Sequence, residues 1–113
     1  MRDDDLARAG TRRLPPAALT GLHEAFRTEV AMRLPALQAA VETGHPCLLS
    51  AAARHAHALG SSAAVVGEPD ASRAARAVEA LLIGWEAGDG DIPLTALRTQ
   101  VRALAACLSG WVR

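Results

Sequence analysis

The sequence predicts an all-α fold, an antiparallel four-helix bundle with a short or frayed N-terminal lead-in. Half of the 113 residues are hydrophobic but only three are aromatic. Alanine, leucine and valine are therefore expected to fill the core, which favours closely packed helices over a sheet. Apolar residues recur at helical spacing in four segments, and no segment shows strand-like alternation. The length suits a single domain.

Residues 1–14 are polar and charged without periodicity, and we expect a flexible N-terminal segment there. Residues 15–113 then form the predicted bundle. The first helix is expected to end near Gly44. Pro35 lies within it and, because proline lacks a backbone donor, is expected to kink or split the helix. The apolar positions of this helix are Leu19, Leu22, Phe26, Val30, Leu34, Leu37 and Val41.

The second helix is expected to begin at Pro46 and to end at Gly67. Its predicted inward face consists of Leu48, Leu49, Ala52, Ala56, Leu59, Ala63 and Val66. Pro69 opens the third helix, with Asp70 as the expected N-cap. The inward positions of the third helix are predicted to be Ala74, Ala77, Val78 and Leu81.

The fourth helix is predicted to start at Asp91 and Pro93, after the Gly-Asp-Gly cluster at 88–90 that ends the third. Its expected buried positions are Leu94, Leu97, Val101, Leu104 and Leu108. Four substantial helices joined by short loops pack most naturally as an antiparallel bundle.

Charge and cysteine content narrow the function classes. Twelve basic and twelve acidic residues balance to a net charge of zero, so the chain has no electrostatic footprint for nucleic acid or a membrane surface. No apolar run approaches the roughly 20 residues needed to span a bilayer, and the acidic N-terminus is unlike a signal peptide. Cys47 and Cys107 lie among apolar residues, and we expect two buried free thiols in a reducing compartment. We therefore expect a soluble, cytoplasmic protein.

One histidine of the second helix is predicted to be an accessible nucleophile. With about 100° per residue, His57 lies about 135° from the centre of the apolar stripe, and His55 about 65° from it. Around His57 the neighbouring positions are Ala53, Arg54, Gly60, Ser61 and Ala64, of which only the arginine is large. An exposed neutral imidazole is a competent nucleophile, and phosphoryl transfer requires alignment and charge stabilisation above all.

The run from Ala56 to Gly67 resembles the signature of the histidine-containing phosphotransfer domains of two-component phosphorelays. The gap-free match falls on His57, Leu59, Ser62, Ala63, Val66 and Gly67. Residues 26–37 look like the family's first long helix, and Ala77-Val78-Glu79 lies where the family often has a Leu-Glu pair. Gly60 and Ser61 stand where the family usually has lysine and glycine, and all twelve basic residues of this chain are arginines.

The resemblance implies that His57 is the phospho-acceptor. A histidine kinase or a receiver domain would donate the phosphoryl group, which would pass to the receiver domain of a response regulator. Arg54 would offset phosphoryl charge, and Gly60, Ser61 and Ala64 would form a smooth docking floor. The chain would have no cofactor of its own, because any magnesium would be bound by the partner. It would be a carrier and not an enzyme, since no nucleotide-binding or nucleophile-elbow motif is present.

Other interpretations remain open. The missing lysine is compatible with a docking module of the same fold that binds a kinase or receiver without transferring phosphate. A third interpretation is an alanine-rich bundle with a structural or dimerisation role. A metal site formed by His45, Cys47, His55 and His57 is disfavoured. Cys47 and His55 would be roughly 12 Å apart along one helix, and His55 and His57 point about 160° apart.

Overall fold

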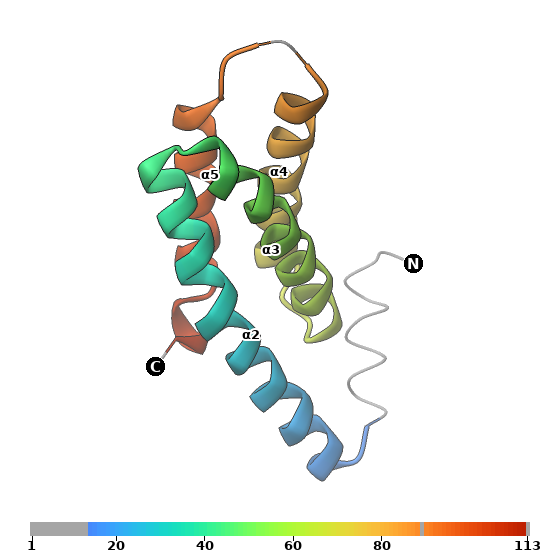
Figure 1. Ribbon diagram of the computed structural model, residues 1–113. Helices are drawn as coiled ribbons and strands as arrows, with labels where there is room; N and C mark the ends of the chain where they lie inside the picture. The colour runs from blue at the N-terminus through green and yellow to red at the C-terminus, as the bar shows by residue number, and fades with distance from the viewer. Residues whose placement is uncertain (1–13, 89, 113) are drawn as a thin grey trace.

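The computed structural model describes residues 14–88 and 90–112 (Figure 1). These residues contain no strand. Residues 1–13 of the expected N-terminal segment lie outside the described residues, and Leu14 is exposed. The all-α prediction is confirmed by four helices and a terminal 3-10 turn: α2 (Pro16–Thr43), α3 (Pro46–Val65), α4 (Pro69–Ala87), α5 (Leu94–Cys107) and η1 (Ser109–Trp111).

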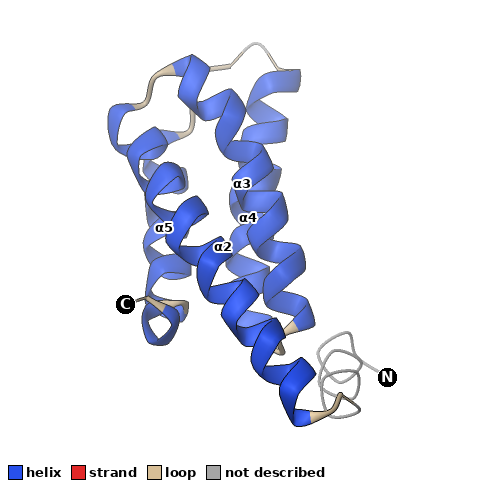
Figure 2. Ribbon diagram, turned by 60° about the horizontal axis from the view of Figure 1, so that its bottom comes forward, coloured by secondary structure: helices blue, strands red, loops and turns tan. Residues whose placement is uncertain are grey.

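The helices form a four-helix bundle. α2 packs against α3 and α5, and α4 also packs against α3 and α5, with the most extensive contact between α3 and α4. Consecutive helices run in opposite directions, as Figures 1 and 2 show. The N-terminal end of α2 extends beyond the other helices in both views, and the first buried residue of α2 is Phe26.

Small side chains line the contact between α3 and α4. Because the separation of two helix axes depends on the side chains between them, alanines allow a close approach. This close approach brings polar groups at the edges of the two helices within hydrogen-bond distance. The buried alanines of α3 and α4 are Ala52, Ala56, Ala63, Ala71, Ala74 and Ala75.

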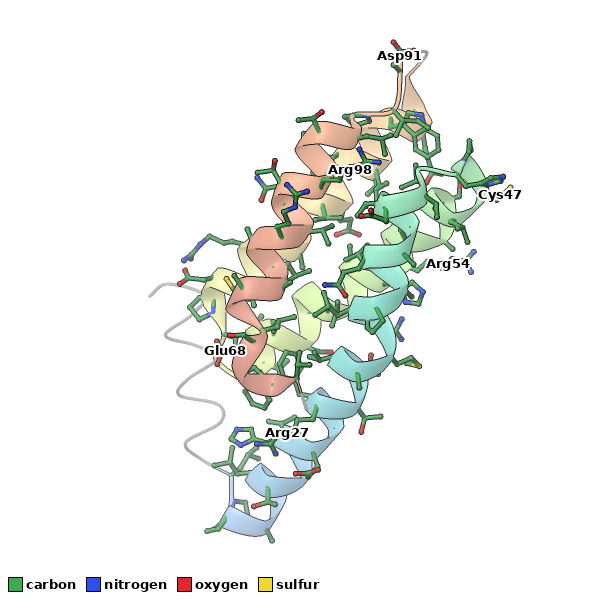
Figure 3. The ribbon with its side chains drawn as sticks, turned by 90° about the vertical axis from the view of Figure 1, so that its left-hand side faces the viewer. Arg27, Cys47, Arg54, Glu68, Asp91 and Arg98 are labelled. Carbon is green, nitrogen blue, oxygen red and sulfur yellow. The ribbon has the colours of Figure 1, made fainter. Side chains whose placement is uncertain are left out.

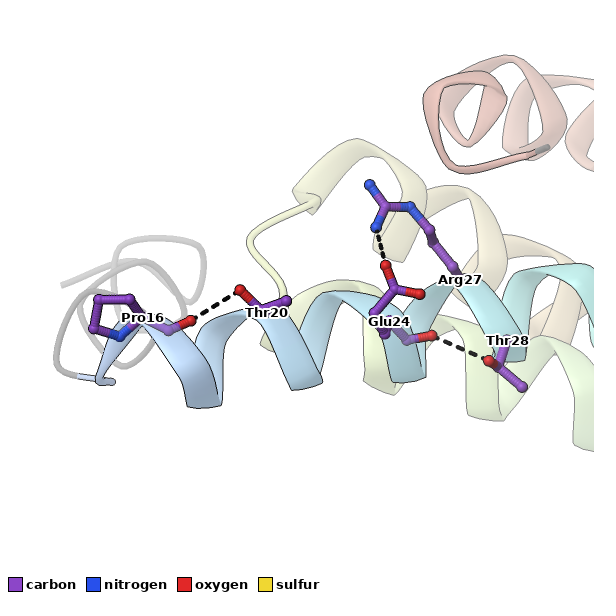
Figure 4. Close-up of polar contacts among 5 residues, drawn as sticks. All are labelled: Pro16, Thr20, Glu24, Arg27 and Thr28. Atoms are coloured by element: carbon purple, nitrogen blue, oxygen red, sulfur yellow. Dashed lines mark hydrogen bonds and ion pairs between the residues drawn. The ribbon is translucent and has the colours of Figure 1, made fainter.

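The first turns of α2 are stabilised by local contacts (Figure 4). Thr20 Oγ1 donates to the Pro16 carbonyl at 3.0 Å, and Thr28 Oγ1 donates to the Glu24 carbonyl at 3.1 Å. Arg27 Nη1 lies 2.7 Å from Glu24 Oε1, an i,i+3 pair. Such exposed pairs contribute only a few tenths of a kcal/mol.

Of the two outcomes predicted for Pro35, a kink or a split of the first helix, the split is wrong. α2 is assigned as one helix from Pro16 to Thr43 with Pro35 inside it. Pro35 lies on the exposed side, and so does Ala31, whose carbonyl loses its usual helical donor. Water can solvate that carbonyl, while buried Leu34 and Leu37 hold the helix on the core from both sides.

Two details of the predicted third helix also need correction. α4 has Glu68 at the N-cap position, so Asp70 lies in the first turn and is not the cap. An acidic residue there still interacts favourably with the helix dipole. Ala77 and Leu81 are only half-buried, because α4 contacts α3 on one side and α5 on the other. The buried face is therefore rotated and includes Ala71, Ser72, Ala74, Ala75, Val78 and Leu82.

Smaller differences occur elsewhere. Leu48 is 47% exposed in the first turn of α3, and Val66 is half-buried beyond its end. α5 begins at Leu94, with Pro93 at its N-cap, and Leu94 itself is half-buried. Cys47, in the first turn of α3, is exposed, and Cys107, the last residue of α5, is half-buried, so the prediction of two buried thiols is wrong. These differences fall at helix ends, where periodicity is least informative.

Trp111 closes one end of the bundle. Its ring packs edge-on against Phe26, with centroids 4.7 Å apart, and against His23 at 5.3 Å. Trp111 Nε1 also donates to Glu68 Oε1 at 3.3 Å. The turn after α5 is thereby held against α2 by ring packing and against the loop between α3 and α4 by a hydrogen bond. Among the described helices, none has a stretch long and apolar enough to cross a membrane.

Candidate functional site

His57 lies in the middle of α3 and points away from the core. Its neighbour Ala56 is fully buried, and Leu59 is 1% exposed on the same inward face. The side chain of His57 is 68% exposed, as its place on the helical wheel predicts. His55, at the boundary of the apolar stripe, is half-buried, which also agrees with the wheel.

A carboxylate from the next helix binds the His57 ring. His57 Nδ1 lies 2.8 Å from Oε2 of Glu79, which is on α4 and only 23% exposed. An ionised carboxylate can only accept a hydrogen bond, so the contact places the ring proton on Nδ1. Nε2 then carries the lone pair of the neutral ring, and it has no hydrogen-bond partner among the described residues. The pair thus sets the tautomer and the orientation of the imidazole.

A buried hydrogen bond fixes the alignment of the two helices near this site. Ser72 Oγ on α4 donates to the Gly60 carbonyl on α3 at 2.9 Å. Ser72 is 5% exposed, and its hydroxyl is satisfied there. Gly60 is one turn beyond His57, and Ser72 is two turns before Glu79. The same bond therefore helps to place Glu79 opposite His57.

Gly60 is part of the helix contact, which corrects its predicted place on an exposed docking floor. It is buried. A Cβ atom at this position would lie 3.5 Å from Ala75 Cβ and from Arg76 Cγ, and 3.6 Å from the Ser72 carbonyl. These are ordinary van der Waals distances, so α4 lies directly against α3 at this position.

The other predicted site residues lie around His57 on the outer side of α3. Arg54 and Ser61 are exposed, and Ala64 is half-buried. Figure 3 shows Arg54 projecting outward from the bundle. Within the described residues its guanidinium forms no hydrogen bond or ion pair. Spacings of three, four and three residues put Arg54, His57, Ser61 and Ala64 on one helical stripe.

The comparison with known families decides the assignment. The family model described as the Hpt domain matches residues 21–110, which include α3, α4 and α5 in full and most of α2. The chain belongs to the Hpt domain family. The resemblance seen in the sequence is thus confirmed, and the chain is a phosphotransfer-type module of two-component signalling. No curated protein and no solved structure matched the chain.

The other histidines near the site of this Hpt domain have structural partners. His55 Nδ1 lies 3.2 Å from Arg33 Nη1, and Arg33 also pairs with Glu29 on α2. His45 caps α3 by accepting a hydrogen bond from the Cys47 backbone N–H at 3.2 Å. In the described part of the chain, no three His, Cys, Asp or Glu side chains are grouped as metal ligands would be.

Glu79 is the residue at the candidate site of this Hpt domain whose contact the sequence did not predict. Family likeness singles out Ala77-Val78-Glu79, but it does not say which side chain the carboxylate faces. The spacing of α4 puts Glu79 next to buried Val78, at the edge of the inward face. Only the alignment of α4 against α3 places that edge over His57.

Proposed function

We propose that His57 carries a phosphoryl group on Nε2 and exchanges it with the active-site aspartate of a receiver domain. The contact between His57 Nδ1 and Glu79 Oε2, at 2.8 Å, is the observation that supports this most directly. It leaves the second ring nitrogen unprotonated on an imidazole that is 68% exposed. A module that only docks needs neither feature.

The transfer step balances without a cofactor of this chain. The Nε2 lone pair attacks phosphorus of an aspartyl phosphate, the P–O bond breaks, and its electron pair stays on the aspartate as a carboxylate. The His57 ring gains one positive charge and keeps its proton on Nδ1, which donates a hydrogen bond to the Glu79 carboxylate. The reverse step passes the group to the next receiver aspartate. A magnesium ion, where one is needed, is part of the partner's site in this proposal.

The surface around His57 is the proposed docking area for these partners. Ser61 and Ala64 have small side chains, so neither projects far from the helix surface after His57. Arg54 brings a positive charge one turn before His57. Histidine kinases and response-regulator receiver domains are the partners we propose, in the cytoplasm. Cys47 and Cys107 are both free thiols, as a reducing compartment allows.

Transfer of radiolabelled phosphate from a panel of phosphorylated receiver domains and kinases tests the proposal. We expect the protein to acquire a label that is lost in acid and stable in base, as phosphohistidine chemistry requires. His57→Gln should abolish labelling. His55→Gln, on the same helix, is the matched control and should retain it. Binding without any label in the native protein would contradict phosphoryl transfer and favour the docking-only module.

A further inference from the structure

The stem of Arg76, on α4, lies against α3 at Gly60. The ideal Cβ position of Gly60 lies 3.5 Å from Arg76 Cγ, an ordinary van der Waals distance. Arg76 is nevertheless an exposed residue. A buried stem with a solvated head group is common for arginine. The exposure of Arg76 therefore leaves its guanidinium open to solvent.

This position is next to the acceptor histidine. Gly60 is three residues after His57, and such residues are neighbours on a helix surface, about 5–6 Å apart between Cβ positions. Arg76 is also three residues before Glu79, the residue that binds the His57 ring. Three further bonds separate Cγ from Cζ, which gives the guanidinium about 4 Å of additional reach.

The guanidinium is available for a ligand. Arg73, one turn earlier on α4, pairs with Asp70, and Arg33 pairs with Glu29. Arg76 forms no hydrogen bond or ion pair with any residue in the described ranges. It is thus a cation without a partner in those ranges, and its stem lies beside Gly60 of α3.

We propose that Arg76 binds the phosphoryl oxygens when His57 is phosphorylated, an inference that rests on the proposed function. The phosphoryl group brings close to two negative charges at neutral pH, and it arrives beside the carboxylate of Glu79. A cation is needed to offset that repulsion. A guanidinium fits phosphoryl oxygens with paired hydrogen bonds. The stem of Arg76 beside Gly60 starts its guanidinium within one helical turn of His57.

Phosphoramidate tests the idea without a protein partner. Nε2 attacks phosphorus, the P–N bond breaks, and the nitrogen leaves as ammonia with the electron pair. We expect Arg76→Ala to lower the initial rate of His57 phosphorylation about tenfold, since a charge-assisted contact is lost. Arg76→Lys should recover part of the rate. Arg102→Ala on α5 removes the same charge elsewhere and should leave the rate within twofold of native.

A charge relocation makes the test specific. Gly60→Lys combined with Arg76→Ala moves the cation from α4 to α3, and the contacts of 3.5–3.6 Å around position 60 leave room for its Cβ. We expect this double variant to be phosphorylated faster than Arg76→Ala alone. Far-ultraviolet circular dichroism establishes that each variant is folded. A folded double variant no faster than Arg76→Ala would contradict a role for the charge.

The possible failures are distinguishable. The same rates are measured with the phosphorylated receiver that labels the native protein. If native His57 is labelled by either donor and Arg76→Ala matches its rate, the Arg76 proposal is wrong and the carrier function stands. If neither donor labels native His57, the carrier function fails and the role of Arg76 fails with it.

Discussion

His57 Nδ1 and Glu79 Oε2 lie 2.8 Å apart although 22 residues separate them in the chain. His57 is on α3 and Glu79 is on α4, so the orientation of the ring depends on how the two helices are aligned. The exposed fraction of the His57 side chain, 68%, shows that this alignment binds one ring nitrogen without covering the ring. The imidazole is thereby held in one orientation and stays accessible to solvent.

Glu79→Ala should slow phosphorylation of His57 about tenfold. The substitution removes the acceptor that holds the Nδ1 proton, and a hydrogen bond to a charged group is worth about 1.5 kcal/mol, or about one factor of ten. Initial rates with the phosphorylated receiver measure this effect. Glu86→Ala, an exposed position on the same helix, is the control. Equal rates for native protein and Glu79→Ala would refute the role given to the pair.

Arg54→Ala should slow transfer from the receiver about threefold at low ionic strength. Arg54 is exposed beside His57, and a charge at the rim of a docking surface acts mainly on the association rate. Such an effect is screened by salt, so the difference should shrink at high ionic strength. Stopped-flow transfer kinetics at several salt concentrations measure it. Arg54→Lys keeps the charge and should behave like the native protein; a salt-independent loss would argue against a docking role.

Ser72→Ala should lower the free energy of unfolding by about 1 kcal/mol. The buried hydroxyl donates to the Gly60 carbonyl at 2.9 Å, and the substitution removes that contact between α3 and α4. Urea unfolding followed by circular dichroism gives the value. Ser50→Ala, exposed on α3, should change stability by less than about 0.5 kcal/mol. Equal midpoints for the two variants would mean that the bond contributes nothing to the helix contact.

Trp111→Ala should destabilise the protein by roughly 2–3 kcal/mol, somewhat less than the loss of a fully buried tryptophan because Trp111 is half-buried. It uncovers Phe26 and removes the hydrogen bond to Glu68. Trp111→Phe keeps an aromatic ring against Phe26 and should cost clearly less. Thermal and urea unfolding measure both variants. A loss as large in Trp111→Phe would assign the effect to the Glu68 bond and not to ring packing.

Helical periodicity predicted the parts of the site that depend on one helix alone. Placing the apolar stripe of residues 46–67 was enough to put His57 outside and His55 at the boundary, because a single helix fixes both directions. Periodicity failed where a second helix decides the outcome. Gly60 is buried because α4 lies on it, and Asp70 is not a cap because the chain already turns into α4 at Glu68.

Pro35 is another position where a rule based on local sequence gave a wrong prediction. Local rules weigh the lost backbone donor and predict an interruption of the helix. The structure keeps α2 continuous, since buried residues before and after the proline hold both halves on one core. Tertiary packing therefore outweighs a local cost that is confined to the solvent-facing side.

By itself the sequence determined the helical class, the order of the four helices, the exposure of His57 and the likeness to phosphotransfer domains. All of these follow from spacing within single segments, which the chain encodes locally. Only the tertiary structure decided that Glu79 faces the ring, that Gly60 is buried and that Arg76 lies beside it. These are relationships between two helices, and they arise from the close contact of small side chains on α3 and α4. The hydrophobic periodicity of each helix does not specify how the two helices are aligned.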